Sequence, residues 1–312
     1  MRVVYIKDNL TNDITELVAQ MTWSGNESEI ARRLELEVLN PLQDYYIPKI
    51  ELQLGGFIIL NSDNEKELFQ GFILSKEKNS QNGNLSLVCV DALFYANKSK
   101  SIHNFSKKTA EEIGATLCNE AKIAIGCLTP TGIAQNFPAN DTVFKIIKDA
   151  YDYASSLNGK KYKINMIQGK IYVEEKSKTA NLLVLTSEND LNGSSYNETF
   201  ENMINVIKVY DDTGKQIGEA KNTDNIKTYG VFQDVYEKEE GKNFNIVANN
   251  LLKGIEKTLS VDAVGNLDCI TGNYVSIIDN IIGVDDDYEI ISDSHVFSNG
   301  THSMHLELRE VS

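Results

Sequence analysis

The stretch Tyr288-Glu-Ile-Ile-Ser-Asp-Ser-His295 is followed by Ser298-Asn299-Gly300 and then by Thr301-His-Ser-Met-His-Leu-Glu-Leu308. In the last of these stretches apolar residues occupy alternate positions, which is the pattern of a strand with one buried face. The Asn-Gly pair supplies the positive φ angles that a tight hairpin turn requires. These residues therefore predict a β-hairpin that closes a sheet near the C-terminus.

A second strand pattern lies directly before this hairpin, in Leu267-Asp-Cys-Ile-Thr-Gly272-Asn-Tyr-Val-Ser-Ile277. A glycine turn leads into a segment whose apolar residues again come at every second position. No catalytic motif interrupts this segment or the hairpin. We therefore predict that the C-terminal part of the chain is built from strands.

The first 100 residues also predict successive short strands, separated by turn signals. These strands are Arg2 to Ile6, Ile14 to Met21, Leu34 to Val38, Ile50 to Leu54, Phe57 to Leu60, Leu68 to Ser75 and Leu85 to Val90. In the third of them, leucine and valine alternate with Glu35 and Glu37. Gln81-Asn82-Gly83-Asn84 predicts a tight hairpin turn. Many short strands at this spacing are typical of a small barrel or sandwich.

From about residue 101 to 185 the apolar period becomes helical. Thr109-Ala-Glu-Glu112 is a capping box, and the helix after it has Ile113, Leu117 and Ala121 as its apolar stripe. A second helix is predicted after Asn140-Asp141. Its apolar face and its C-terminal stop are Val143, Ile147, Ala150, Tyr151, Ala154 and Gly159. A hairpin over Tyr162 to Val173, turning at Gln168-Gly169, completes a compact α+β insertion.

Strand patterns return after about residue 186. Met203 to Tyr210 leads into the turn Asp211-Asp-Thr-Gly214, and a single helix is predicted over about Phe244 to Leu259. The predicted fold is mainly β, with two β-barrels that flank a small α/β domain. The predicted domains are residues 1–100, 101–185 and 186–312.

The composition is that of a soluble globular protein of 312 residues, 41% of them hydrophobic, with a formal net charge of −15. No apolar run approaches the roughly 20 residues of a membrane span, so no membrane insertion is expected. The negative charge argues against sequence-specific or phosphate-led binding to nucleic acid, although it suits a surface along which DNA slides. The N-terminus lacks the pattern of a signal peptide, so the mature chain is expected to start at Met1.

The four cysteines are far apart, with no C-x-x-C pair, and are expected to be reduced. They are Cys89, Cys118, Cys127 and Cys269. A metal site is conceivable at His295, His302 and His305. However, residues 302 and 305 are an odd number of positions apart, so only one of them can join His295 on the same face of a strand. We therefore expect strand residues, with one histidine fixing the hairpin by a hydrogen bond, and no metal.

Two acidic segments resemble cation sites only in part. Glu188-Asn-Asp190-Leu-Asn192-Gly193 matches the first half of a calcium loop, but the position of its final ligand is Thr199, with Glu198 one place early. A turn into a strand is the favoured interpretation. Asp285-Asp-Asp287 is interpreted as a solvated turn.

Catalytic chemistry has no motif to support it. The sequence contains no H-E-x-x-H, no G-x-S-x-G and no glycine-rich phosphate loop. We assign no catalytic, cofactor-binding or metal-binding residue, and expect no cofactor. Trp23, the sole tryptophan, lies at the predicted end of a strand and is interpreted as a core or interface anchor.

Several stretches, in order along almost the whole chain, resemble baseplate hub proteins of contractile phage tails and phage-tail-like bacteriocins of the PBSX type. They are Tyr5-Ile-Lys-Asp8, Lys66-Glu-Leu-Phe-Gln-Gly71-Phe-Ile, Val90-Asp91-Ala-Leu-Phe-Tyr95, Tyr229-Gly230-Val-Phe-Gln233, Gly272-Asn-Tyr-Val-Ser-Ile277 and His295-Val-Phe-Ser-Asn-Gly300-Thr-His302-Ser-Met304. Each is a turn glycine with strand alternation, so the specificity lies in their order.

The resemblance implies a structural protein, not an enzyme, whose two tail-tube-like barrels form a homotrimeric ring of pseudo-sixfold symmetry. The implied partners are the central spike, the tail tube or tube-initiator protein, the tape-measure protein and the baseplate wedge proteins. The implied location is the baseplate of a phage virion or bacteriocin particle, assembled in the bacterial cytoplasm. On this basis the strand Leu68 to Ile73 is expected to lie at a subunit interface.

Two other functions stay open at this point. Small β-barrels often host carbohydrate-binding or cell-surface-binding modules. A peptidoglycan hydrolase is the less favoured alternative, because its paired carboxylates or zinc ligands are not evident. The sequence does not distinguish an infectious phage from a DNA-free bacteriocin.

Overall fold

The computed structural model describes residues 1–40, 46, 48, 50–78, 83–177, 182–238 and 244–311. The chain divides into two compact units. The first unit comprises residues 1–193 and 261–311, and the second unit comprises residues 194–260. None of the helices in these ranges has the length and apolarity that a membrane crossing requires. The architecture is mainly β with α-helical additions, which confirms the predicted fold class.

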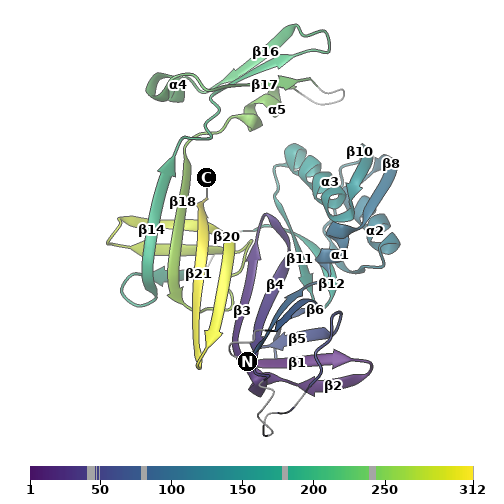
Figure 1. Cartoon of the computed structure of the whole chain (residues 1–312). Coiled ribbons are helices and arrows are strands. Elements are labelled where there is room, and N and C mark those ends of the chain that lie inside the picture. Colours follow the sequence, from purple (N-terminus) through teal and green to yellow (C-terminus); the bar gives the residue numbers. More distant parts are fainter. Residues whose placement is uncertain are drawn as a thin grey trace. The chain divides into compact units, whose positions relative to one another are not determined.

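The N-terminal part of the first unit is an antiparallel sheet in the order β3-β4-β7-β6-β5-β1-β2 (Figure 1). Its strands are β1 (Arg2–Lys7), β2 (Leu10–Asp13), β3 (Val18–Asn26), β4 (Glu29–Val38), β5 (Phe57–Asn61), β6 (Glu67–Lys78) and β7 (Leu85–Val90). Leu34, Leu36 and Val38 are buried while Glu35 is exposed, so the predicted alternation is confirmed.

Two predictions for this sheet need correction, and a third lies partly outside the described residues. The segment predicted as a strand from Ile14 begins with a 3-10 helix, Thr15–Leu17, because its polar first residues form a tight turn. Residues 50–54, predicted as a strand, have no strand pairing among the described residues. In the predicted turn at 81–84, Gln81 and Asn82 lie outside the described residues, and Gly83 has a φ of 72°.

Later residues of the chain supply further strands to the same sheet. These are β13 (Leu183–Thr186), β14 (Leu191–Thr199), β18 (Glu256–Val264), β19 (Tyr274–Asp279), β20 (Val284–Ser298) and β21 (Thr301–Glu310). The hairpin predicted at the C-terminus is confirmed as β20 and β21, with Asn299 and Gly300 at φ 51° and 73°. Asp285-Asp-Asp287, predicted as a turn, lies in β20 instead, because it pairs with Ile278 to Ser276 of β19.

Strand β20 joins the N-terminal and C-terminal sheets into one sheet of 13 strands. Its first residues pair with β19, and its residues 292–298 pair with β3. On its other edge, β20 pairs through Tyr288–Ser298 with the whole of β21. The two halves are therefore not separate sheets, since hydrogen bonds cross from one to the other.

The insertion between the two sheet halves packs helices on two small sheets (Figure 1). Its elements are α1 (Leu93–Lys98), β8 (Lys100–Lys108), α2 (Ala110–Glu120), β9 (Ala124–Leu128), β10 (Gln135–Thr142), α3 (Val143–Asn158), β11 (Tyr162–Ile167) and β12 (Lys170–Glu175). Thr109 and Glu112 form the predicted capping box, and Gly159 ends α3 with a φ of 72°. Ile113, Leu117 and the predicted apolar face of α3 are buried in the core of the insertion.

The second unit has its own small sheet, in the order β16-β15-β17. Its elements are β15 (Val206–Tyr210), β16 (Gln216–Lys221), α4 (Thr223–Tyr229), β17 (Gln233–Glu237) and α5 (Phe244–Leu251). The predicted turn is confirmed, because the Gly214 amide donates to the Asp211 carbonyl. The helix predicted to reach Leu259 ends at Leu251, and Leu259 is a buried residue of β18. The three-domain division stays a prediction.

Candidate functional site

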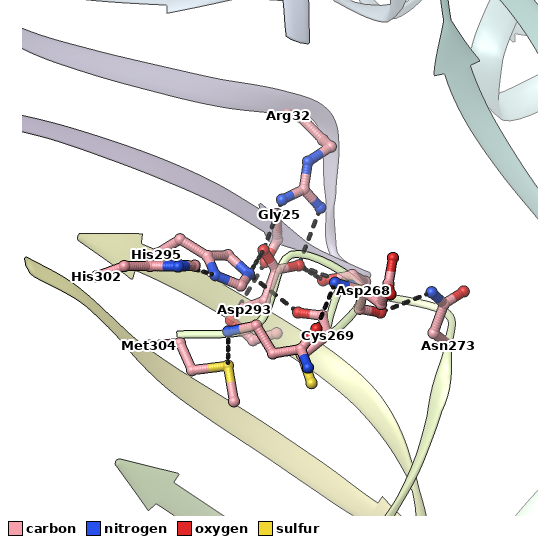
Figure 2. Close-up of polar contacts among 12 residues, drawn as sticks. Gly25, Arg32, Asp268, Cys269, Asn273, Asp293, His295, His302 and Met304 are labelled. Atoms are coloured by element: carbon pink, nitrogen blue, oxygen red, sulfur yellow. Dashed lines mark hydrogen bonds and ion pairs between the residues drawn. The ribbon is translucent and has the colours of Figure 1, made fainter. Parts of the chain in front are cut away.

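A buried ion pair lies where β3 and β20 meet. Asp293 of β20 is 1% exposed, and both of its carboxylate oxygens accept hydrogen bonds from the Arg32 guanidinium of β4, at 2.9 and 2.5 Å (Figure 2). The guanidinium passes directly over Gly25 of β3, where a Cβ atom would lie 2.3 Å from Nη1. Only glycine leaves room for this contact, so a side chain at position 25 would displace the arginine.

Asp293 also accepts hydrogen bonds from the loop that precedes β19. The Thr271 amide and hydroxyl both donate to Asp293 Oδ1 at 2.6 Å. A single buried carboxylate therefore accepts hydrogen bonds from β4 and from the 267–273 loop, while its own strand pairs with β3. Because every one of these bonds is made to a buried charged group, each is stronger than an ordinary surface bond.

Two histidines extend this polar cluster into the C-terminal hairpin. His295, which is fully buried, donates from Nε2 to the Cys269 carbonyl at 3.0 Å, because a carbonyl oxygen can only accept. Its Nδ1 therefore accepts from Nε2 of His302, also at 3.0 Å (Figure 2). Burial lowers the pKa of His295, and it lowers the pKa of His302 to about 4. Both rings are neutral at pH 7.

Trp23 packs against this polar cluster and contacts two of its members. Its ring lies 5.2 Å from the His295 ring, and the Arg32 guanidinium lies 4.2 Å over it. Trp23 is 3% exposed, which confirms its interpretation as a core anchor. It lies within β3 and not at a strand end, because the strand continues to Asn26.

The predicted separation of the three late histidines is confirmed. His302 joins His295, while His305 faces the other side of the sheet and contacts Asp262 at 2.7 Å. The His302 ring lies against Gly265, where a Cβ atom would come within 2.1 Å of the ring. Within the described residues, no three His, Cys, Asp or Glu side chains are placed to share a metal ion.

The partial calcium-loop motif is a turn, as predicted. The Thr186 amide and hydroxyl both donate to Asp190 Oδ2, and β14 starts at the next residue. This carboxylate satisfies backbone and hydroxyl donors of its own turn. Asn192 and Gly193, the fifth and sixth positions of the motif, already lie in β14.

The opposite face of the strands at the junction carries small polar side chains, and we call it the hydroxyl face. It consists of Thr22, Ser24, Ser294, Val296, Ser298 and Ser303, with Val296 as its small apolar member. The register places these residues side by side across β3, β20 and β21. Glu35 of β4 pairs with Thr22 and continues the face with a carboxylate. His305, paired with Ser294, and Arg33, paired with Ser24, lie on the same face. The result is a polar surface, with larger side chains around its small central ones, that crosses both sheet halves.

Sequence reasoning identified the histidines but missed Arg32, Asp293 and Thr271. A signal was present, because Arg32 is in phase with the buried leucines of β4 and Asp293 is in phase with His295. Two inward-facing charges of opposite sign predict a buried pair.

Comparison with known proteins gives consistent results. The protein family described as YqbQ-like matches residues 21–309. The uncharacterized protein YqbQ of Bacillus subtilis is 26% identical over 78% of this chain and 78% of its own length. The phage-like element PBSX protein XkdQ of Bacillus subtilis is 23% identical over 95% of this chain and 93% of its own.

Among solved structures, the 43 kDa tail protein of prophage MuSo2 from Shewanella oneidensis has a similar fold. The TM-score is 0.74, the sequence identity is 12%, and the match covers 99% of this chain and 98% of the tail protein. The resemblance to phage-tail baseplate hub proteins of the PBSX type, stated from the ordered motifs, is thereby confirmed. With the fold of a prophage tail protein and a family match over nearly its whole length, the chain belongs to the YqbQ-like family.

Proposed function

We propose that this protein is a structural hub of a phage-type tail baseplate, without catalytic turnover. In this proposal three copies form a ring of pseudo-sixfold symmetry that joins the tail tube to the central spike. The relationship to the PBSX protein XkdQ and the fold shared with a prophage tail protein support a structural role in a tail. The remaining partners would be the tape-measure and wedge proteins, in a particle assembled in the bacterial cytoplasm.

The hydroxyl face carries the proposal. A channel wall has to be continuous, flat and free of groups that bind whatever passes through it. The hydroxyl face meets part of this requirement, since its central side chains are short and its register runs from β21 through β20 and β3 to β4. Together with a net charge of −15, such a wall would repel DNA phosphates and prevent DNA from adhering. We assign this face to the channel.

Ring closure in this proposal requires one half of the sheet to meet the other half in the next copy. Along the strand Leu68 to Ile73, expected at an interface, β6 pairs with β5 on one edge, and its pairing with β7 on the other edge begins only at Phe72. Strands β2 and β13 are further candidates for the interface. Each ends a path in the sheet, and each exposes apolar residues: Leu10 is 68% exposed and Val184 is 46% exposed.

Negative-stain electron microscopy of the purified chain, alone and with a co-expressed spike protein, tests the proposal. We expect class averages of a threefold ring with an axial hole. Discrete monomers in both preparations would reject the ring and favour a binding module, for which a glycan array is the appropriate next measurement. Clearing on cell-wall zymograms would reject the purely structural role.

A further inference from the structure

A cavity of about 580 Å³ lies within the first unit, away from the hydroxyl face. Its walls come from the turn between β3 and β4, the start of β6, helix α3, the loop 267–273, and the segment 161–169 that contains β11. The volume is that of a binding cleft for a small ligand or a short stretch of extended chain.

The segment Lys161 to Gly169, which contains β11 (Tyr162–Ile167), contributes nine consecutive residues to the lining of this cavity. A strand that turned one face toward a cavity would contribute every second residue, because side chains alternate between faces. Consecutive lining residues therefore indicate that β11 presents its edge. The sheet order β11-β12-β9 agrees, since it leaves one edge of β11 without a neighbouring strand.

The register identifies the backbone groups at that free edge. The two-residue turn makes Ile167 and Lys170 a hydrogen-bonded pair, and the bond from the Lys176 amide to the Lys161 carbonyl confirms the phase. Lys163 and Asn165 therefore bond to β12. The amides and carbonyls of Ile164 and Met166 point the other way, and within the described residues no strand pairs with them.

We propose that the free edge of β11 binds an extended peptide segment of a partner protein as an added strand, with the side chains of that segment received by the cavity. Addition of a strand to an exposed edge is a common mode of peptide recognition, in which main-chain bonds give affinity and flanking pockets give selectivity. The inference does not depend on the ring, because the cavity lies within a single chain.

The lining specifies the chemistry of the peptide. Ile30, Leu68 and Phe144 from the opposing walls, with Ile164 and Met166, form apolar surfaces for alternate side chains. Four carboxylates of the lining, Glu27, Asp152, Asp268 and Glu289, each pair with a lysine or arginine of this chain.

Lys163 has a different environment. Its ammonium donates to the side-chain oxygen of Asn273 at 3.1 Å. Burial lowers its pKa, and among the described residues no carboxylate forms an ion pair with it. An acidic side chain on the peptide would supply the missing charge. Glu67 of β6, hydrogen-bonded to the Gln168 backbone just beyond β11, has its pKa raised by burial and is a weaker opposing charge. The expected peptide therefore alternates apolar residues and carries an aspartate or glutamate.

The test uses the immobilised full-length chain and a pool of acetylated, amidated octapeptides randomised at every position. We expect retained peptides to share alternating apolar residues and one acidic residue. The Ile164→Pro variant should retain them at least tenfold less well, because proline removes an outward amide while the bonds to β12 remain. Ile164→Val, which keeps the amide and an apolar side chain, is the matched control and should bind as the parent does.

Met166→Pro repeats the test at the second outward amide, and thermal melting establishes that each variant is folded. Lys163→Met should abolish the preference for acidic residues while apolar selection persists. Hydrogen exchange gives an independent reading: a retained peptide should slow exchange of the Ile164 and Met166 amides at least tenfold. Equal retention by the parent and both proline variants, no retention by the parent, or protection at another strand would each overturn the proposal.

Discussion

At the scale of single residues, Asp293 is the group on which the joined sheet depends. It is buried on β20 and accepts hydrogen bonds from Arg32 and Thr271, which lie on separate parts of the chain. Removal of one partner of a buried pair leaves the other charge without compensation, and this costs more than the pair itself contributes.

Asp293→Asn is therefore expected to lower the free energy of unfolding by about 3–5 kcal/mol. Urea denaturation followed by circular dichroism measures this change. Asp262→Asn, which removes a 65% exposed carboxylate beside His305, is the control and should change stability by less than about 1 kcal/mol. Similar losses in the two variants would show that the buried carboxylate has no special role.

A buried carboxyl and a half-buried imidazole give the protein opposing responses to acid. Burial raises the pKa of Asp91 from 3.8 to about 7, so the stability it contributes is full below pH 3.8 and is lost as pH rises to 7. Burial lowers the pKa of His302 from 6.5 to about 4, so its contribution is full above pH 6.5 and is lost as pH falls to 4. Between pH 4 and 6.5 the two effects oppose each other.

Single substitutions separate the two effects. We expect Asp91→Asn to lose stability more steeply than the parent between pH 6.5 and 5, and His302→Gln to lose it less steeply or to gain it. Each slope should differ from that of the parent by at most about 1.4 kcal/mol per pH unit, the limit for one proton. Urea unfolding at three pH values measures the slopes, and parallel curves for all three proteins would contradict the assignment.

At the scale of elements, local signals predicted the C-terminal hairpin, the capping box of α2, the length of α3 and the hairpin of β11 and β12. Each of these depends on residues close together in sequence. The same reasoning extended the helix at Phe244 to Leu259, because Ile255 and Leu259 continue its apolar spacing. The residues from Glu256 onward pair as β18 instead. Short elements such as β2 and α1 were missed because four to six residues carry too little periodicity.

Thr109→Ala removes the N-cap of α2 and is expected to cost about 1 kcal/mol, because the Glu112 amide loses its acceptor. Thermal unfolding measures the loss. Thr116→Ala on the same helix removes a hydroxyl that bonds only to the Glu112 carbonyl, and it should be neutral or slightly stabilising. A loss at position 116 as large as at position 109 would argue against capping as the cause.

At the scale of the whole molecule, the decisive contact is the pairing of β20 with β3. Nothing local in either strand specifies the other as its partner, so the sequence did not predict that strands pair across the two halves of the sheet. The site shares this limit. The histidines were found from their spacing within one hairpin, whereas Arg32 and Asp293 are 261 positions apart.

The exposed strands at the ends of the sheet lead to a prediction about assembly. Leu10→Lys in β2 and Val184→Lys in β13 are each expected to prevent ring formation while the chain stays folded, because a charge blocks edge-to-edge pairing. Sedimentation velocity and electron microscopy show whether each variant forms rings. Ile281→Lys, at a residue 86% exposed outside both strands, is the control and should assemble normally. Rings formed by the Leu10 and Val184 variants would exclude these edges from the interface.

The bond between the Ser292 hydroxyl and the Gly25 carbonyl spans 267 positions, and it has a consequence for how the protein is made. Strand β3 leaves the ribosome early, but its partner emerges only when translation is almost complete. Until then one edge of β3 stays unsatisfied and exposed to other nascent chains. Chains that terminate early never cover that edge, so aggregation or proteolysis would remove them before they reach an assembling particle.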